Sequence, residues 1–397
     1  MLPAETVTVV VNGAPYQGWK SVTVNQSFDN AAGTAILVVS ETQFAKFPIK
    51  DGAQVQILLG TTPAITGYVQ TVDGSDTWTS HEISLKIDDQ TIDFIQSTLG
   101  PGHDYKPPIK LADLLRKTLG KMGLGKIGVI DKVNPEEFGP AEVPTGAVDQ
   151  FGHEFGDQWA RQRQTVLNTD GKGNLVIDRN RQEMGAGRLW RARETDPTNA
   201  LNNIKGAKYK KDISSRYNKT MQASQKSQND KKHWESRPKG DHPAQALPMS
   251  KKWGEAQDTG IRPERKRHYR GSKGLNNSSP KKGAKWRSNL SKSRGFQYSA
   301  TVQGFERGPG ALWWPGKLVT VRDDNWDLAD VLFIVAVRFH KDWSKGATTE
   351  VSCTYSDAFT EQDDGTKSRT GKSGVGGSDP GDYAPADTSG TEYQDGG

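Results

Sequence analysis

Few groups in this sequence have the residue types and spacing that catalysis or metal binding requires. The run His153-Glu154-Phe155-Gly156-Asp157 places His153 and Asp157 one helical turn apart, so that both side chains could reach one metal ion, as in HExxH zinc peptidases. The second histidine of that motif is missing. Phe155 instead continues an apolar stripe with Val148, Phe151 and Trp159, which is typical of ordinary helix packing. We therefore expect no metal and no cofactor.

Two acidic pairs raise the question of glycoside hydrolysis. Glu136-Glu137 and Asp323-Asp324 supply carboxylates, but such enzymes need two carboxyl groups about 5 to 9 Å apart, one of them with a raised pKa. Solvated turn residues account for both pairs more simply. The sequence also contains no GxSxG, no Walker A motif and no convincing GxGxxG after a strand. We expect a protein that is not an enzyme.

The strongest chemical signal is a cationic segment with interleaved aromatic residues. Residues 205–294 hold 25 Lys and Arg against 7 Asp and Glu, in a chain whose net charge is only +6. Cations beside aromatic rings neutralise phosphates and stack on bases, but they also dock acidic protein surfaces or simply keep a loop solvated, and all three interpretations stay open. The candidate partner-facing or DNA-facing residues are Lys251, Lys252, Arg262, Arg265, Lys266, Arg267, Arg270, Lys281, Lys282, Lys285 and Arg287.

A second candidate contact is the aromatic pair Trp313-Trp314, which precedes Pro315. Aromatic residues concentrate binding energy at interfaces, so the pair could anchor a partner. More often such a pair seals the edge of a barrel, and we favour that interpretation.

Composition limits the architecture that positions these residues. A chain of 397 residues with 33% hydrophobic residues and a mean hydropathy of -0.74 predicts two or three domains, with part of the chain outside any core. The single cysteine, Cys353, excludes an intramolecular disulfide and a cysteine zinc site. No run reaches the about 18 apolar residues of a membrane span, and the start lacks a signal-peptide pattern. We expect no stable membrane insertion. We also expect the chain to stay in the compartment of its synthesis, unless something else carries it out.

Hydrophobic periodicity predicts the domains. Period-two alternation with turn signals such as Asn12-Gly13 indicates a first β-barrel, tube-like domain over 1–96. A helical stripe then predicts a small α/β domain over 97–204; its apolar residues are Leu111, Leu114, Leu115 and Leu119. Strands return in a second such β domain over 205–360, which carries a long basic insertion at 229–294 and a short cationic helix, PKKGAKWRSNLSKSR. Residues 361–397 are expected to form a flexible acidic tail rich in Gly and Ser.

The two β regions share an internal repeat. The strand HEISLKIDD matches TEVSCTYSD, so that Leu85 corresponds to Cys353, and Val69 and Val337 stand thirteen residues upstream of the two glutamates. Farther back, Asp51-Gly52 mirrors Pro315-Gly316. Generic alternation could produce part of this match, but we favour duplication. The predicted fold class is β-rich α+β, with two similar antiparallel β-barrel-like domains and an inserted small α/β domain. Three copies of such a chain can close into a ring of approximate six-fold symmetry.

The sequence resembles the baseplate hub proteins of contractile-tailed bacteriophages, the Mu-like tail hub family. The resemblance is strongest from Trp313 to Phe359: a Pro-Gly before a strand, an acidic turn, a long apolar strand ending in Phe339-His340-Lys341-Asp342, and a Thr-Thr-Glu strand ending in Asp-Ala-Phe. The order of segments is similar from residue 1 to about 360. Residues 229–280 depart from the family in length and basic density.

This resemblance implies a structural homotrimer that joins a six-fold tail tube to a three-fold spike or needle and leaves a channel for DNA. Implied partners are the chain itself, spike, tube and other baseplate proteins, with transient contact to phage DNA. The implied location is the virion tail baseplate, after assembly in the host bacterial cytoplasm. Two alternatives stay open: a nucleic-acid-binding protein that uses residues 229–294, and, less favoured, a tail-associated cell-wall hydrolase.

Overall fold

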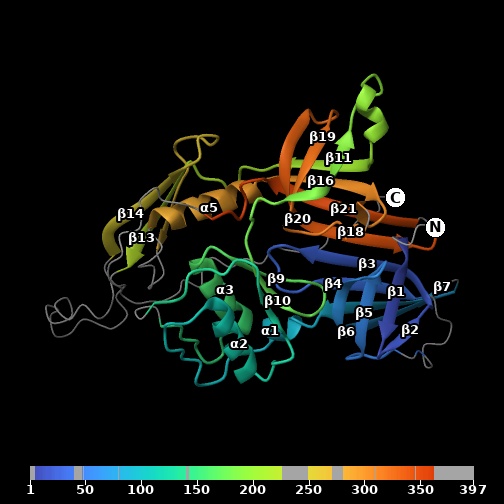
Figure 1. The fold of residues 1–397 in the computed structure, drawn as a ribbon, viewed down its shortest axis with the longest axis horizontal. Helices are drawn as coiled ribbons and strands as arrows, with labels where there is room; N and C mark the ends of the chain where they lie inside the picture. The colour runs from blue at the N-terminus through green and yellow to red at the C-terminus, as the bar shows by residue number, and fades with distance from the viewer. Residues whose placement is uncertain are drawn as a thin grey trace.

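The fold is known from a computed structural model that describes residues 5–39, 47, 49–78, 80–139, 143–225, 249–270, 280–308, 310–344 and 346–361. Within these residues, strands dominate and most pairings are antiparallel, while three of the four α-helices gather beside one part of the large sheet (Figure 1). The predicted β-rich α+β class is confirmed. The predicted tail after Glu361 lies outside the described residues.

The first β unit is built on alternating buried apolar side chains. Its strands are β1 (Val7–Val11), β2 (Ala14–Tyr16), β3 (Trp19–Ser27), β4 (Thr34–Val39), β5 (Gln54–Leu59), β6 (Thr62–Thr77) and β7 (Ser80–Asp89). Their spatial order is β3-β4-β7-β6-β5-β1-β2. The predicted Asn12-Gly13 turn joins β1 to β2, and both residues have positive φ.

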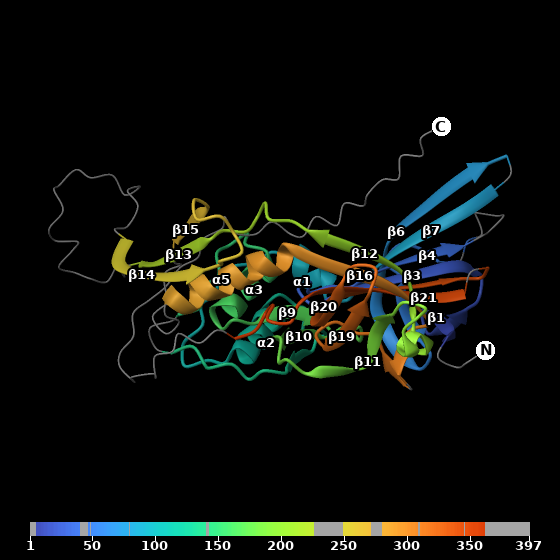
Figure 2. The same cartoon turned by 90° about the horizontal axis from the view of Figure 1, so that it is seen from above.

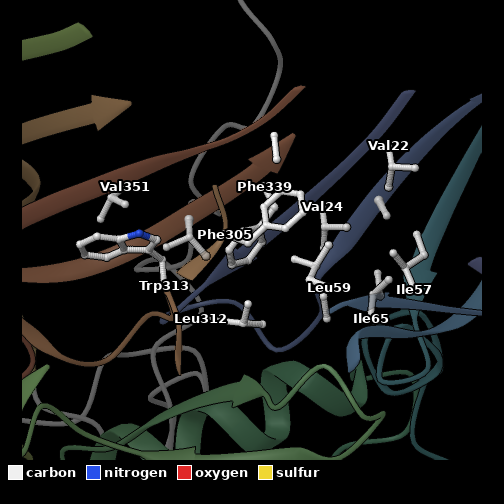
Figure 3. Packing of buried hydrophobic residues seen from close by; sticks show 14 of the residues in the cluster. Val22, Val24, Ile57, Leu59, Ile65, Phe305, Leu312, Trp313, Phe339 and Val351 are labelled. Carbon is white, nitrogen blue, oxygen red and sulfur yellow. The ribbon is translucent and has the colours of Figure 1, made fainter. Parts of the chain in front are cut away.

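The second β unit contains β12 (Ile204–Lys211), β16 (Phe296–Gln303), β19 (Leu318–Asp323), β20 (Leu328–Asp342) and β21 (Gly346–Tyr355), in the order β12-β16-β21-β20-β19. Strand β11 (Met184–Arg191) pairs parallel to β19, and β17 (Glu306–Gly308) pairs with β18 (Ala311–Leu312). Strand β20 also pairs with β3, so both units form one sheet of 13 strands over a shared apolar core (Figure 3).

The α/β region has a core of its own. It contains α1 (Ile92–Gln96), α2 (Leu111–Lys121), β8 (Val129–Asp131), α3 (Gly152–Gln162), β9 (Val166–Thr169) and β10 (Leu175–Asp178). The four leucines predicted to face the core of α2 are all buried. The predicted stripe of the next helix is wrong in its first half: α3 begins only at Gly152, so Val148 and Phe151 precede it and are exposed.

A basic module is inserted between β12 and β16. It consists of β13 (Lys219–Gln225), β14 (Met249–Gln257), β15 (Lys266–Arg270) and α5 (Pro280–Arg294), which packs across β13 and β14 (Figures 1 and 2). The helix α5 coincides with the predicted cationic helix. Most of the polar stretch from residue 229 to 250 lies outside the described residues, as does Trp234.

Candidate assembly and partner-binding surfaces

The two β units have the same topology, strand for strand. In chain order, β3, β4, β5, β6 and β7 correspond to β12, β16, β19, β20 and β21, and each unit places them in the same spatial order. One pair of hydrogen bonds fixes the residue equivalence. The Gly52 amide donates to the Val69 carbonyl at 2.8 Å, and the Gly316 amide donates to the Ile334 carbonyl at 2.9 Å. Val69 is therefore equivalent to Ile334.

The β-bulges also coincide. One interrupts the β6–β7 ladder just after Val69, and its counterpart interrupts the β20–β21 ladder just after Ile334. A second matched pair lies after Trp19 in β3 and after Ile204 in β12. Alternation alone does not place bulges, because each one is a local insertion in a specific ladder. The shared bulges therefore support a duplicated unit.

The residue equivalences inferred from the sequence need one correction. The ladders pair Val69 with Ile87 and Ile334 with Cys353, so Cys353 corresponds to Ile87 rather than Leu85, and Val337 is not the counterpart of Val69. The error in the closing strand is a slip of two residues. Such a slip keeps every side chain on its own face of the sheet, which is why the sequence match looked regular.

The two units meet at a seam between β3 and β20, whose antiparallel ladder runs from Ser21 opposite Asp342 to Ser27 opposite Ala336. At its end, the Trp343 amide donates to the Lys20 carbonyl at 3.2 Å, and the Trp343 indole donates to the Trp19 carbonyl. The rings of Trp19 and Trp343 lie 5.9 Å apart. The seam thus shows how one β unit binds the other: through an antiparallel ladder with a tryptophan contact at its end.

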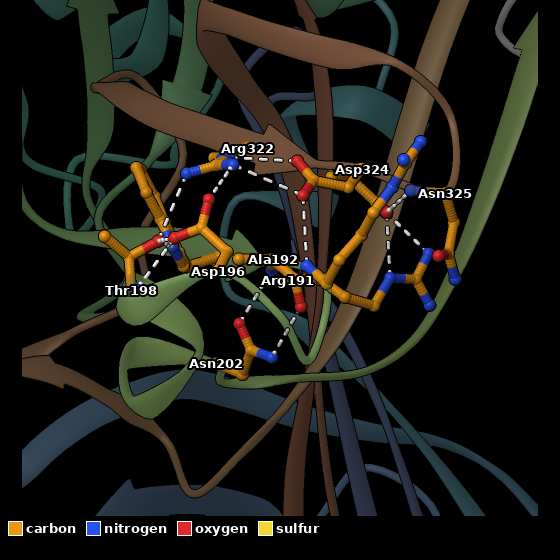
Figure 4. Close-up of polar contacts among 11 residues, drawn as sticks. Arg191, Ala192, Asp196, Thr198, Asn202, Arg322, Asp324 and Asn325 are labelled. Atoms are coloured by element: carbon orange, nitrogen blue, oxygen red, sulfur yellow. Dashed lines mark hydrogen bonds and ion pairs between the residues drawn. The ribbon is translucent and has the colours of Figure 1, made fainter.

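A buried ion pair ties the chain before β12 to the second unit (Figure 4). Asp323 is fully buried, accepts two hydrogen bonds from Arg191 at 2.8 and 2.6 Å, and accepts another from the Tyr298 hydroxyl at 2.7 Å. Burial and the Asp323 charge raise the pKa of Tyr298. The expectation that Asp323 is a solvated turn residue is therefore wrong; its carboxylate is held as an ion pair.

A second ion-pair cluster lies beside the first and is more exposed. Arg322 contacts Asp324 at 2.9 Å and Asp196 at 2.5 Å. The hydroxyl and amide of Thr198, together with Arg322, lower the pKa of Asp196 to about 2. Both clusters fasten the end of β11 and the chain that follows it to the end of β19.

The basic module orders several of the predicted cations in a column. Arg265 and Arg267 stack on the Tyr217 ring at 5.6 and 5.3 Å, Arg267 also stacks on Tyr269 at 4.8 Å, and Arg287 covers the other end of the column over Tyr269 at 4.2 Å. Stacking keeps the positive charge and fixes its position. The column crosses from the loop before β13 through β15 to α5.

The remaining predicted cations are not among the three arginines that define the Tyr217–Tyr269 column. Arg262 and Lys266 are exposed, Lys281, Lys282 and Lys285 lie on α5, and the side chains of Lys251, Lys252 and Arg270 lie outside those described. Of the interleaved aromatics, Trp286 is only 9% exposed and packs against Phe359, while Trp253 remains 44% exposed with its ring edge-on to His268. Trp286 is therefore not available to stack on bases in this conformation.

The pair Trp313-Trp314 lies mainly in the core. Trp313 is 2% exposed (Figure 3), and the partly buried Trp314 stacks on Phe339 with the ring centroids 6.4 Å apart. This burial favours the packing interpretation over a surface anchor.

The catalytic and metal candidates do not converge. His153 contacts the carbonyl of Ile95 through Nδ1 at 3.0 Å, and Asp157, whose pKa is raised by burial, pairs with Arg161 at 3.3 Å. Within the described part of the chain, no three His, Cys, Asp or Glu side chains gather in a metal-binding arrangement, and no helix is long and apolar enough to cross a membrane.

Comparisons with known proteins give a family match for each of the two β units. Residues 6–87 match the family model for the N-terminal domain of the Mu phage baseplate assembly protein GpP-like group, and residues 291–354 match a tail protein C-terminal domain. The resemblance to Mu-like phage baseplate proteins is confirmed. The two matches fall on the first and second β units. No functionally curated protein matches the sequence.

The fold also resembles those of solved structures. One is the 43 kDa tail protein of prophage MuSo2 from Shewanella oneidensis, with a TM-score of 0.69 and 21% identity over 88% of this chain and 98% of that one. Another is the tail protein from Neisseria meningitidis MC58, with a TM-score of 0.69 and 17% identity over 89% and 97% of the two chains. At these identities the likeness supports the fold.

Proposed function

We propose that this protein is a non-catalytic, Mu-like baseplate hub: a homotrimeric ring that joins a six-fold tail tube to a three-fold spike and leaves a channel for DNA. The observation that carries the proposal is the duplicated unit, because three chains with two equivalent units each present six similar surfaces. Such a ring matches a six-fold partner on one face and keeps three-fold symmetry elsewhere.

The remaining parts of the chain have roles in the same proposal. The β domains over 1–96 and 205–360 build the ring, and the α/β domain over 97–204 lies outside it. The basic module projects away from the large sheet (Figure 2) and docks an acidic neighbour in the baseplate, such as another tail protein. The protein then acts in the virion, after assembly in the host cytoplasm.

Sedimentation equilibrium of the purified full chain tests the proposal. We expect a stable trimer without added nucleic acid, and electron micrographs of ring-shaped particles with six similar lobes on one face. A monomer at all concentrations would refute the hub.

The second candidate function is nucleic-acid binding, which the stacked Arg and Tyr column of the basic module favours. It predicts a monomer that changes its sedimentation only when DNA is added. The hydrolase alternative is tested by the turbidity of a peptidoglycan suspension, which we expect to stay constant on addition of the protein.

A further inference from the structure

Two strand edges of this chain correspond to the two sides of the β3–β20 seam. By the equivalence of the units, β12 is the counterpart of β3, and residues 71–77 of β6 are the counterpart of residues 336–342 of β20. Among the described strands, β12 pairs only with β16, and β6 beyond Gln70 pairs only with β7. Each unit thus carries one half of a seam that the single chain does not complete.

We propose that β12 of one protomer pairs antiparallel with residues 71–77 of β6 in the next protomer, so that three identical ladders close the ring. The proposal rests on the trimer proposed above and names its interface. It repeats between chains the contact that β3 and β20 make within one chain. Because the two edges differ, the contact is head-to-tail, as a three-fold ring requires.

The intrachain seam predicts the register of the new ladder. Matching bulges equate Ser21 with Gly206, and matching hairpins equate Asp342 with Thr77. Transfer of the β3–β20 register then gives these opposite pairs: Thr71 with Asp212, Val72 with Lys211, Asp73 with Lys210, Gly74 with Tyr209, Ser75 with Lys208, Asp76 with Ala207, and Thr77 with Gly206.

The charges of the two edges are complementary. The edge strand β12 carries four lysines, while the facing hairpin carries acidic residues; these are Lys205, Lys208, Lys210 and Lys211 against Asp73, Asp76 and Glu82. Opposite charges directly across a ladder stabilise it and like charges destabilise it, so β12 is repelled by a second β12 and attracted by β6. In the intrachain seam, by contrast, Arg338 faces the neutral Asn25. The charge pattern therefore selects the proposed pairing over self-pairing of either edge.

The tryptophan at the hairpin tip gives independent support. Trp78 follows β6 as Trp343 follows β20. Trp343 is 71% exposed but its ring contacts Trp19, whereas Trp78 is fully exposed in the single chain. The counterpart of Trp19 is Ile204, and a surface hollow lined by Asn203, Ile204, Lys205 and Gln303 among others lies at that position. Trp78 of one protomer would fill this hollow of the next protomer.

Charge exchange tests the predicted register. Asp73→Lys or Lys210→Asp alone should raise the trimer dissociation constant at least tenfold in sedimentation equilibrium, and the double variant should restore it. The control Lys126→Asp makes the same charge change at an exposed site in the α/β region and should leave the trimer intact. Failure of the double variant to recover would count against the Asp73–Lys210 pairing.

Disulfide cross-linking tests the same contact with substitutions that remove no buried side chain. The variant Ser75→Cys with Lys208→Cys should form covalent trimers on oxidation in a non-reducing gel, because opposite residues of an antiparallel ladder have Cα atoms within disulfide reach. The native Cys353 is buried and does not compete. Ser75→Cys alone should give no covalent ladder.

Trp78→Ala has a matched control in Trp343→Ala. The first should weaken the trimer without changing the melting temperature of the protomer, and the second should lower that melting temperature through the intrachain seam. A wild-type trimer that none of these variants changes, and that the paired cysteines do not link, overturns this interface and leaves the hub standing. A wild-type monomer overturns both.

Discussion

The carboxylate of Asp323 is stabilised by partners that are far away in the sequence. Arg191 lies 132 residues before it, and Tyr298 lies 25 residues before it. A buried charge is tolerated only when its hydrogen bonds are made, so each partner depends on the other two.

Replacement of Asp323 should therefore lower the stability of the fold. We expect Asp323→Ala to lower the free energy of unfolding by about 3 kcal/mol, because the change leaves the Arg191 charge and the Tyr298 hydroxyl without their acceptor. Urea denaturation followed by circular dichroism measures this. Asp330→Ala, an exposed change on the same hairpin, should cost under about 0.5 kcal/mol. Equal costs for the two variants would contradict the buried role of Asp323.

Asp89 should make stability depend on pH. Burial raises its pKa to about 6, although Thr91 and Thr169 donate hydrogen bonds to it. The folded state then binds the proton more tightly than the unfolded state, whose pKa is 3.8. Its contribution to the free energy of unfolding therefore falls as the pH rises from about 4 to about 6, by about 3 kcal/mol at most.

The variant Asp89→Asn should remove this component, since its amide cannot ionise. Denaturation curves at pH 5, 6 and 7 should show a smaller fall for the variant than for the wild type. Asp113→Asn, an exposed change on α2, serves as the control and should keep the wild-type profile. A wild-type profile for Asp89→Asn would show that Asp89 does not cause the pH dependence.

At the scale of elements, the basic module depends on close contact between α5 and β14. A Cβ atom added at Gly254 would lie 2.0 Å from the carbonyl carbon of Pro280 and 2.1 Å from the amide nitrogen of Lys281. Backbone atoms at that distance have to move apart. Gly254 thus allows the start of the helix to lie directly on the sheet.

We expect Gly254→Ala to detach the start of α5 and destabilise the module by about 1–3 kcal/mol. Trypsin digestion under native conditions should cut the Lys-rich module several-fold faster than in the wild type, while the large sheet stays intact. Gly120→Ala meets open space in α2 and should not change the digestion pattern. Unchanged cleavage in Gly254→Ala would argue against tight packing of the helix.

For the molecule as a whole, the positive charge is concentrated in one insertion while the rest of the chain is net acidic. We expect weak binding of the full chain to DNA that falls steeply with salt, because contacts to phosphates release counterions. Fluorescence anisotropy with a labelled duplex at about 50 and 200 mM salt measures both effects. Sub-micromolar binding to one sequence that resists salt would instead support the nucleic-acid function.

Local patterns were readable from the sequence alone. The alternating strands, the Asn12-Gly13 turn, the leucine stripe of α2, the cationic helix and the existence of a repeat all depend on residues a few positions apart or on direct similarity. Only the tertiary structure decided which edges pair, which residues of the two units correspond, and that Asp323 is buried beside Arg191. The reason is physical: a slip of two residues preserves the buried face of a strand, and the seam and the ion pair join residues that the sequence separates by more than a hundred positions.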